Sequence, residues 1–260
     1  MKKNQFYLCL LICGISITTI ICGYHYYVPP RLSQPYQLSP EQDDTLHVAF
    51  IGDSWAFMHN YHHCKISQLL VDTIHQPVKV HSYGICGLTS KEIYENIFNN
   101  MELKQFFQKR TYKYCFISAG INDTYKKMST SYYKTSMDGI IQFLLANHIY
   151  PIILEIPDYD IRKAFEKQTL FRIIVRRISM FITGTPIDSK QQLRNSLNEL
   201  IQEKDYTNRV CVIRYKTWNN NYVDDQRQIY QDDGMHLNEK GYDVLDSIIA
   251  IHLTDLSSEE

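Results

Sequence analysis

The chain has 260 residues, of which 44% are hydrophobic, and a formal net charge of −1. This length fits one domain with appendages, and the near-zero charge gives no reason to expect a polyanion such as nucleic acid as a partner. None of the seven cysteines forms a Cys-x-x-C pair, which argues against a zinc ribbon or a thioredoxin-like motif.

The first apolar segment, residues 1–23, predicts a membrane helix. Lys2 and Lys3 precede about 18 apolar residues without a charge, which just suffice to span a bilayer core. Lysines before the span place the N-terminus in the cytoplasm and the rest of the chain outside it. Because no small-x-small cleavage site precedes Tyr24, we expect an uncleaved signal-anchor. A cleaved signal peptide, which would release a secreted protein, remains the alternative.

Residues 24–45 are rich in Tyr, Pro, Gln and Ser, which predicts a semi-extended linker that lifts the following domain off the membrane. The domain itself is expected over residues 46–256. Four of its cysteines would be able to pair outside the cytoplasm, in an arrangement that the sequence leaves open: Cys64, Cys86, Cys115 and Cys211.

Strand-like and helix-like runs alternate within this domain. Short apolar runs rich in Val, Ile, Phe or Tyr predict strands at 47–52, 78–82, 114–119, 151–156 and 210–215. Helical patterns fall at 64–75, 89–108, 132–148, 188–204 and 238–253. The alternation predicts an α/β fold, in which a parallel sheet is covered by helices on both faces.

An insertion at 158–187 interrupts the alternation. Its apolar residues follow helical spacing, and Arg172, Arg176 and Arg177 lie between them. Amphipathic helices usually turn their apolar face to the core, so we expect this helix to pack on the domain. A helix that lies on a membrane surface, or one that acts as a lid, is the alternative.

The apolar run of the first strand leads into Gly52, Asp53 and Ser54. Ser54 is therefore expected at the carboxyl end of a parallel strand, where sites collect, as either a helix cap or a nucleophile. A nucleophilic serine needs a base and a group that orients that base. Asp233 and His236 supply such a pair in a turn-rich stretch before the last helix. The other histidines after Ser54 (His59, His62 and His63) are expected in a polar loop.

Acyl transfer also needs hydrogen-bond donors for the developing oxyanion. Asn122 follows the third strand, and its side-chain amide is one candidate. Gly84 and Gly87 follow the second strand, where a glycine lets the backbone N–H approach a ligand closely. A helix cap at Asn122 and a plain glycine turn are the alternatives.

As a set, these blocks resemble those of the SGNH hydrolase superfamily, also called GDSL esterases, in a membrane-anchored bacterial form. The blocks are Gly-Asp-Ser at 52–54, the glycine at 87, Gly-x-Asn-Asp at 120–123 and Asp-x-x-His at 233–236. The resemblance implies a three-layer α/β/α sandwich with a central five-stranded parallel sheet, similar to flavodoxin. It spans about residues 46–253.

By position, the resemblance implies that Ser54 is the nucleophile, His236 the base and Asp233 the triad acid. It also implies an oxyanion hole made by the Ser54 N–H, the Gly87 N–H and the Asn122 amide. Two further acidic residues in the blocks, Asp53 and Asp123, are expected to be hydrogen-bond acceptors that shape loops. An α/β-hydrolase is disfavoured, because its nucleophile lies in Gly-x-Ser-x-Gly and position 56 here is Ala.

The expected function is ester hydrolysis without a metal or cofactor. An enzyme of this type outside the cytoplasm is expected to remove O-acyl groups, above all acetyl, from an envelope or capsular polysaccharide. A phospholipase or lysophospholipase and a carbohydrate O-acetyltransferase are the enzymatic alternatives, and a silent glycan-binding module is the alternative outside enzymes. The expected partners are an ester substrate and the membrane, and the oligomeric state stays open.

Overall fold

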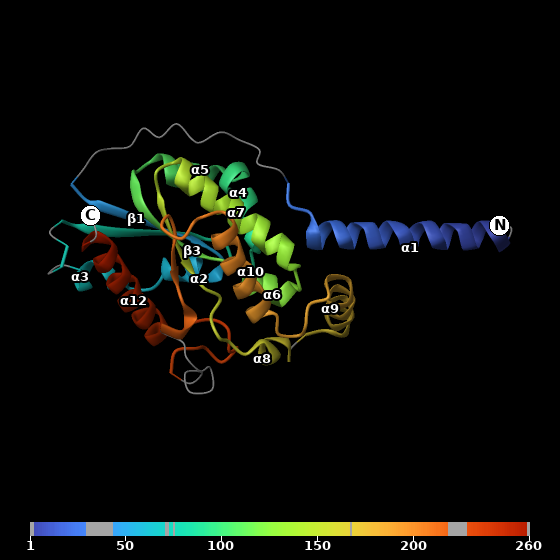
Figure 1. Ribbon diagram of the computed structural model, residues 1–260. Coiled ribbons are helices and arrows are strands. Elements are labelled where there is room, and N and C mark those ends of the chain that lie inside the picture. Colours follow the sequence, from blue (N-terminus) through green and yellow to red (C-terminus); the bar gives the residue numbers. More distant parts are fainter. Residues whose placement is uncertain are drawn as a thin grey trace.

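Five parallel strands form one sheet in the order β2-β1-β3-β4-β5 in the computed structural model (Figure 1). The strands are β1 Leu46–Gly52, β2 Val78–Gly84, β3 Tyr112–Ser118, β4 Tyr150–Leu154 and β5 Cys211–Ile213. The structure describes residues 3–29, 44–70, 73–74, 76–166, 168–217 and 228–258. All seven residues of β1 are buried, as a central strand with helices on both faces requires. The strand predictions are confirmed to within a few residues at each end.

Two layers of helices cover the sheet. One contains α4 Ser90–Asn99, α5 Met101–Gln108, α7 Thr130–Ala146 and α10 Lys190–Glu203, with α7 packed on both α4 and α10. The other contains α3 Ile66–Leu69 and α12 Glu239–Ser258, which pack together across the strands from α7 (Figure 1). The predicted three-layer sandwich is confirmed.

Several predicted helices have different bounds. The helix expected at 89–108 is two helices, because the Asn100 side chain accepts a hydrogen bond from Leu103 N and caps a new start for α5. The helix expected at 64–75 is the single turn α3, with residues 71, 72 and 75 outside the described part. Two short helices, α2 Ser54–His59 and α6 Ile121–Lys126, were not among the predicted helices. Both directly follow a strand end.

Helix α1, Lys3–Tyr26, is long and apolar enough over Tyr7–Tyr26 to cross a membrane, a property that signal sequences share. It projects from the body of the protein (Figure 1). Its last turn contacts that body directly, since the His25 carbonyl accepts hydrogen bonds from Ser129 N (3.3 Å) and Ser129 Oγ (2.9 Å). Of the predicted linker, positions 30–43 lie outside the described residues.

The insertion contains two helices, α8 Ile161–Phe165 and α9 Leu170–Thr183. The expectation that the amphipathic helix packs its apolar face on the domain is wrong. Ser179 is the buried residue of α9, whereas Phe171 is 74% and Phe181 is 89% exposed. This helix turns most of its apolar side away from the body of the protein.

All seven cysteines are free thiols. Cys115 is fully buried in β3, where it packs as a small apolar side chain. The possible pairing among the four cysteines of the domain is not formed.

Candidate active site

The candidate site lies beyond the carboxyl ends of three adjacent strands. Gly52 ends β1 and is in register with Gly84 of β2 and Ser118 of β3. Ser54, Gly87 and Asn122 follow these three strand ends within a few residues. Because the strands are parallel neighbours, the sheet itself gathers these residues at one edge.

Ser54 and His236 are in hydrogen-bond contact. Ser54 is the first residue of α2, and its Oγ lies 3.1 Å from His236 Nε2. On the other side of the imidazole, Nδ1 lies 2.5 Å from Asp233 Oδ2. The structure therefore brings together the serine, histidine and aspartate that the sequence suggested, as one chain of two hydrogen bonds.

Backbone N–H groups of the same loop hold the Asp233 side chain in place. Its Oδ1 accepts hydrogen bonds from the backbone N–H of Met235 (2.9 Å) and His236 (3.0 Å). Partial burial by itself raises the pKa of Asp233, but the hydrogen bonds from the side chain and backbone of His236 and from Met235 outweigh it, so the pKa lies below its ordinary value. Asp233 is therefore ionised at neutral pH and accepts a hydrogen bond from the Nδ1–H group of His236.

Further contacts hold this loop against α2. The indole Nε1 of Trp55 donates to the Met235 carbonyl (3.3 Å), and the Tyr242 hydroxyl donates to the Trp55 carbonyl (3.3 Å). Tyr230 and Leu237 form an isolated antiparallel bridge at the base of the loop. Trp55 and Tyr242 were not predicted as site residues. A tryptophan directly after the nucleophile was the available signal for the first.

Asp53 and Asp123 act as structural acceptors, as predicted. Asp53 caps α2 by accepting from Trp55 N (3.1 Å), and it also accepts from Ser118 Oγ (3.0 Å). Burial raises its pKa to about 6. Asp123 accepts from both the backbone N–H (2.9 Å) and the hydroxyl (2.6 Å) of Ser90 and so ties α6 to α4.

The Asn122 side chain is available as a donor. It is 8% exposed, and its Nδ2 has no hydrogen-bond partner among the residues that the structure describes. A buried amide without a partner costs free energy, which a ligand oxygen would recover. Gly120, not Asn122, occupies the N-cap position of α6, so the alternative of an Asn cap is wrong.

The two candidate glycines of the second strand end have different surroundings. A Cβ on Gly84 would lie 2.2 Å from Phe57 N and 2.5 Å from Asp53 O, so this glycine lets β2 pack against the start of α2. Gly87 has a φ of +81° with open space where its Cβ would be. Gly87 thus sits in a left-handed turn with open space beside its Cα, which leaves room for a ligand to approach the backbone.

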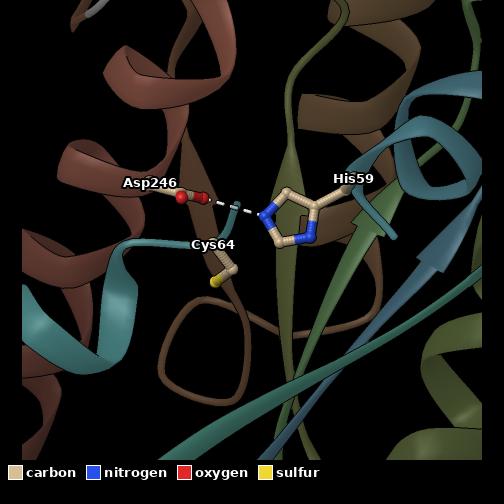
Figure 2. Close-up of side chains that lie close together, drawn as sticks. All are labelled: His59, Cys64 and Asp246. Atoms are coloured by element: carbon tan, nitrogen blue, oxygen red, sulfur yellow. Dashed lines mark hydrogen bonds and ion pairs between the residues drawn. The ribbon is translucent and has the colours of Figure 1, made fainter. Parts of the chain in front are cut away.

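Another serine, histidine and aspartate lie at the far end of α2. His59 Nε2 is 2.8 Å from Asp246 Oδ1, and His59 Nδ1 is 2.7 Å from Ser82 Oγ. Figure 2 shows that Cys64 lies beside this pair. His59 is 3% exposed, so the expectation of a polar loop at this position is wrong: α2 carries the ring into the space between β2 and α12.

The ligand atoms of His59, Cys64 and Asp246 lie within 4.8 Å of one another, close enough to share a metal ion. Both carboxylate oxygens of Asp246 are already used, Oδ1 by His59 and Oδ2 by the Lys65 backbone N–H at 2.7 Å. Burial and the nearby Asp246 raise the pKa of the Cys64 thiol to about 11, so it is protonated at neutral pH. The group is satisfied by its own hydrogen bonds and clamps α2 to α12.

A model of the GDSL-like lipase/acylhydrolase family matches residues 50–244. No curated protein matches the chain.

Solved structures share the fold at low identity. A lipase/acylhydrolase from Enterococcus faecalis is 15% identical with a TM-score of 0.56, over 81% of this chain and 96% of that one. A protein described as a putative platelet activating factor from Streptococcus pneumonia is 16% identical with a TM-score of 0.56, over 96% and 97%. An acetylxylan esterase from Geobacillus stearothermophilus is 13% identical with a TM-score of 0.52, over 80% and 94%.

Proposed function

The chain belongs to the GDSL-like lipase/acylhydrolase family, and from this premise we propose a serine esterase that removes O-acyl groups, above all acetyl, from an envelope or capsular polysaccharide. One observation carries the proposal: the chain of hydrogen bonds from Ser54 through His236 to Asp233. Support for the acetyl group comes from the acetylxylan esterases among the similar structures.

In the first half-reaction, His236 Nε2 takes the proton of Ser54 as Oγ attacks the acyl carbonyl carbon. Asp233 holds the Nδ1 proton and stabilises the imidazolium that forms. The Ser54 N–H lies at the start of α2, where helix N–H groups lack acceptors within the helix, and it donates to the oxyanion together with the Gly87 N–H and Asn122 Nδ2. His236 then gives its proton to the departing alcohol oxygen, which leaves the acyl group on Ser54.

The second half-reaction releases the acyl group. His236 takes a proton from a water molecule, whose oxygen attacks the acyl carbon, and the same donors bind the second oxyanion. The carboxylic acid leaves as Ser54 Oγ recovers a proton from His236. Each proton is returned within a cycle, so the residues of the chain suffice for the chemistry.

We also propose that α1 is a permanent anchor that holds the domain outside the cytoplasm. Its last turn is part of the packed protein: His25 is 3% exposed and accepts two hydrogen bonds from Ser129. Cleavage after residue 23 would remove helical residues directly before these contacts. The lysines before the span favour an internal N-terminus.

A second candidate is a lysophospholipase, which one observation favours. An apolar groove of about 590 Å³ lies between α1 and α9, lined by residues that include Ile20, Ile21, Phe171 and Val175. Its volume is in the range of small-molecule sites, and apolar walls suit a fatty acyl chain.

The test compares three substrate classes on the full chain: acetylated oligosaccharides, short-chain chromogenic esters and lysophospholipids. Release of acetate from the oligosaccharides by the wild type, together with loss of that activity in Ser54→Ala, is the expected result. Preference for lysophospholipids would select the second candidate. A Ser54→Ala variant that keeps full turnover, or a wild type that a fluorophosphonate does not label at Ser54, would overturn the esterase assignment.

A further inference from the structure

Helix α9 exposes the apolar face that an ordinary surface helix turns toward the core. Six large apolar side chains on it are between 43% and 89% exposed: Leu170, Phe171, Ile174, Val175, Ile178 and Phe181. At 100° per residue they occupy one continuous face of the helix. An apolar face of this size on a helix in water is costly, since exposed apolar surface gains nothing from the hydrophobic effect.

The side of α9 that meets the protein carries polar groups next to the half-buried Ile173 and Met180. The Arg176 guanidinium stacks over the Phe165 ring at 4.0 Å, and the Ser179 side chain is 3% exposed. The Thr183 hydroxyl donates to the Ser179 carbonyl (2.8 Å). The fold therefore holds α9 by a mixed side that includes Arg176 and presents the larger apolar face outward, where an apolar medium would cover it.

The position of α9 shows which medium this is. The helix lies beside the body end of α1 and runs across its direction (Figure 1). The Tyr26 hydroxyl, in the last residue of α1, donates to the Ile182 carbonyl of α9 (3.0 Å). If α1 crosses a bilayer, α9 lies where that bilayer ends, along its surface.

The charges of α9 have one sign. Its sequence contains Arg172, Arg176 and Arg177 and no acidic residue. Arg172 and Arg177 are exposed and flank the apolar face on its two sides, where long basic side chains reach anionic headgroups while their stems stay in the apolar layer.

We propose that α9 inserts its apolar face into the outer surface of the anionic bilayer that holds α1, with Arg172 and Arg177 on the phosphate groups. The inference rests on the proposed anchoring by α1, and it is independent of the proposed reaction. The groove between α1 and α9 then opens into the acyl-chain region and fills with lipid.

The proposed membrane contact of α9 also determines where the candidate site lies relative to the bilayer. Tyr125 and Lys126 line the groove at the C-terminal end of α6, and Asn122 lies in the first turn of the same helix. Since α6 has six residues, the proposed oxyanion donor is about one turn from the membrane contact. The enzyme therefore holds its site against the membrane surface.

Fluorescence quenching tests the insertion. Phe181→Trp in the full chain is reconstituted into nanodiscs of phosphatidylglycerol with brominated acyl chains, and the emission of the parent protein is subtracted. We expect the introduced indole to lose most of its emission relative to nanodiscs without bromine. Tyr61→Trp is the matched control, because Tyr61 is an aromatic residue with 78% exposure after α2 and outside the proposed contact.

Equal quenching at the two positions would overturn the proposal. An indole at 181 whose emission is shifted to the blue in detergent and is not quenched by bromine would also overturn it, since a second copy of the chain would then cover α9. Arg172→Gln with Arg177→Gln should reduce quenching in phosphatidylglycerol toward the value in phosphatidylcholine. None of these readings uses turnover, so failure of the esterase assignment would leave them unchanged.

Discussion

The hydroxyl oxygen of Ser54 lies 3.1 Å from Nε2 of His236, although 182 positions separate the two residues in the chain. Two different elements produce this contact: the start of α2 at the end of β1, and the loop before α12. The loop is held on α2 by Trp55, whose indole donates to the Met235 carbonyl. Substitutions in either element should therefore change the reaction in ways that kinetics can measure.

Asp233→Asn should lower kcat by roughly 10⁴-fold while KM stays close to that of the wild type. The amide is able to donate to His236 Nδ1 and would favour the tautomer that carries its proton on Nε2, which cannot accept the proton of Ser54. Steady-state kinetics with a short-chain ester measures the effect. Asp232→Asn, one residue earlier, is the control and should keep wild-type kcat. Equal kcat values for both variants would remove Asp233 from the triad.

Asn122→Ala should reduce kcat by about 10²- to 10³-fold with little change in KM, because the lost donor acts on charge that develops in the transition state. Thermal stability should not fall, since Asn122 Nδ2 has no partner to lose among the described residues. Asn96→Ala loses only a bond to the Glu92 carbonyl within α4 (2.8 Å) and serves as the control. Wild-type kcat in Asn122→Ala would assign the oxyanion to other donors.

Substitution of the two glycines should separate packing from catalysis. Gly84→Ala places a Cβ against Phe57 N and Asp53 O and should lower the melting temperature by several degrees. Gly87→Ala meets no neighbouring atom, although its φ of +81° strains an L-residue by about 1 kcal/mol. The melting temperature of Gly87→Ala should therefore change little. Its kcat should fall, because the substitution alters the backbone at a proposed oxyanion donor. A lower melting temperature for Gly87→Ala than for Gly84→Ala, together with a lower kcat for Gly84→Ala, would contradict this assignment of roles.

The buried Asp53 makes stability depend on pH. Burial raises its pKa from 3.8 to about 6 in the folded protein, so the folded state binds more protons than the unfolded state between about pH 4 and pH 6. Stability therefore falls as the pH rises through this window. Asp123 adds a contribution of the same sign, because burial raises its pKa to about 6 as well.

Asp53→Asn should flatten this part of the stability curve, measured as melting temperature at pH 4, 5 and 6. The amide oxygen still accepts from Trp55 N, so the cap on α2 is kept. Asp255→Asn, at an exposed position of α12, should leave the slope as in the wild type. A wild-type slope in Asp53→Asn would show that Asp53 does not titrate in this range.

The His59–Asp246 clamp should stabilise the fold without a metal. Asp246→Ala leaves His59 Nε2 and Lys65 N without an acceptor, and about 1–3 kcal/mol of stability should be lost for each buried group. Dialysis against a chelator should leave the melting temperature of the wild type unchanged. A lower melting temperature after chelation, restored by Zn²⁺, would show that the clamp is a metal site instead.

The sheet and the gathering of site residues could be predicted from sequence because they depend on local patterns. The runs predicted as strands at 47–52, 78–82 and 114–119 end within two residues of the observed strand ends, and parallel pairing then brings the residues after each strand to one edge of the sheet. The short helices α2 and α6 escaped prediction, since six residues carry too little periodicity. The burial of His59 depends on Asp246, which lies 187 positions away.

The orientation of α9 could not be derived from the sequence for a different reason. Its pattern predicts an amphipathic helix but does not state which medium the apolar face meets. That choice depends on which partners the polar side finds, such as Phe165 for Arg176. A residue pattern defines a face, and only the tertiary contacts define where that face points.

The contact between Ser129 and the last turn of α1 bears on how far from a membrane the candidate site could meet its substrates. An enzyme on a loose tether samples a range of heights above a membrane and meets substrates throughout that layer. If α1 is the anchor proposed above, the body is held directly on that anchor, and Ser54 would work at one fixed height. On the proposed polysaccharide substrate, esters near the membrane would be within range, whereas esters farther from the membrane would be out of range. Lengthening α1 by whole helical turns would raise that height and shift the accessible layer.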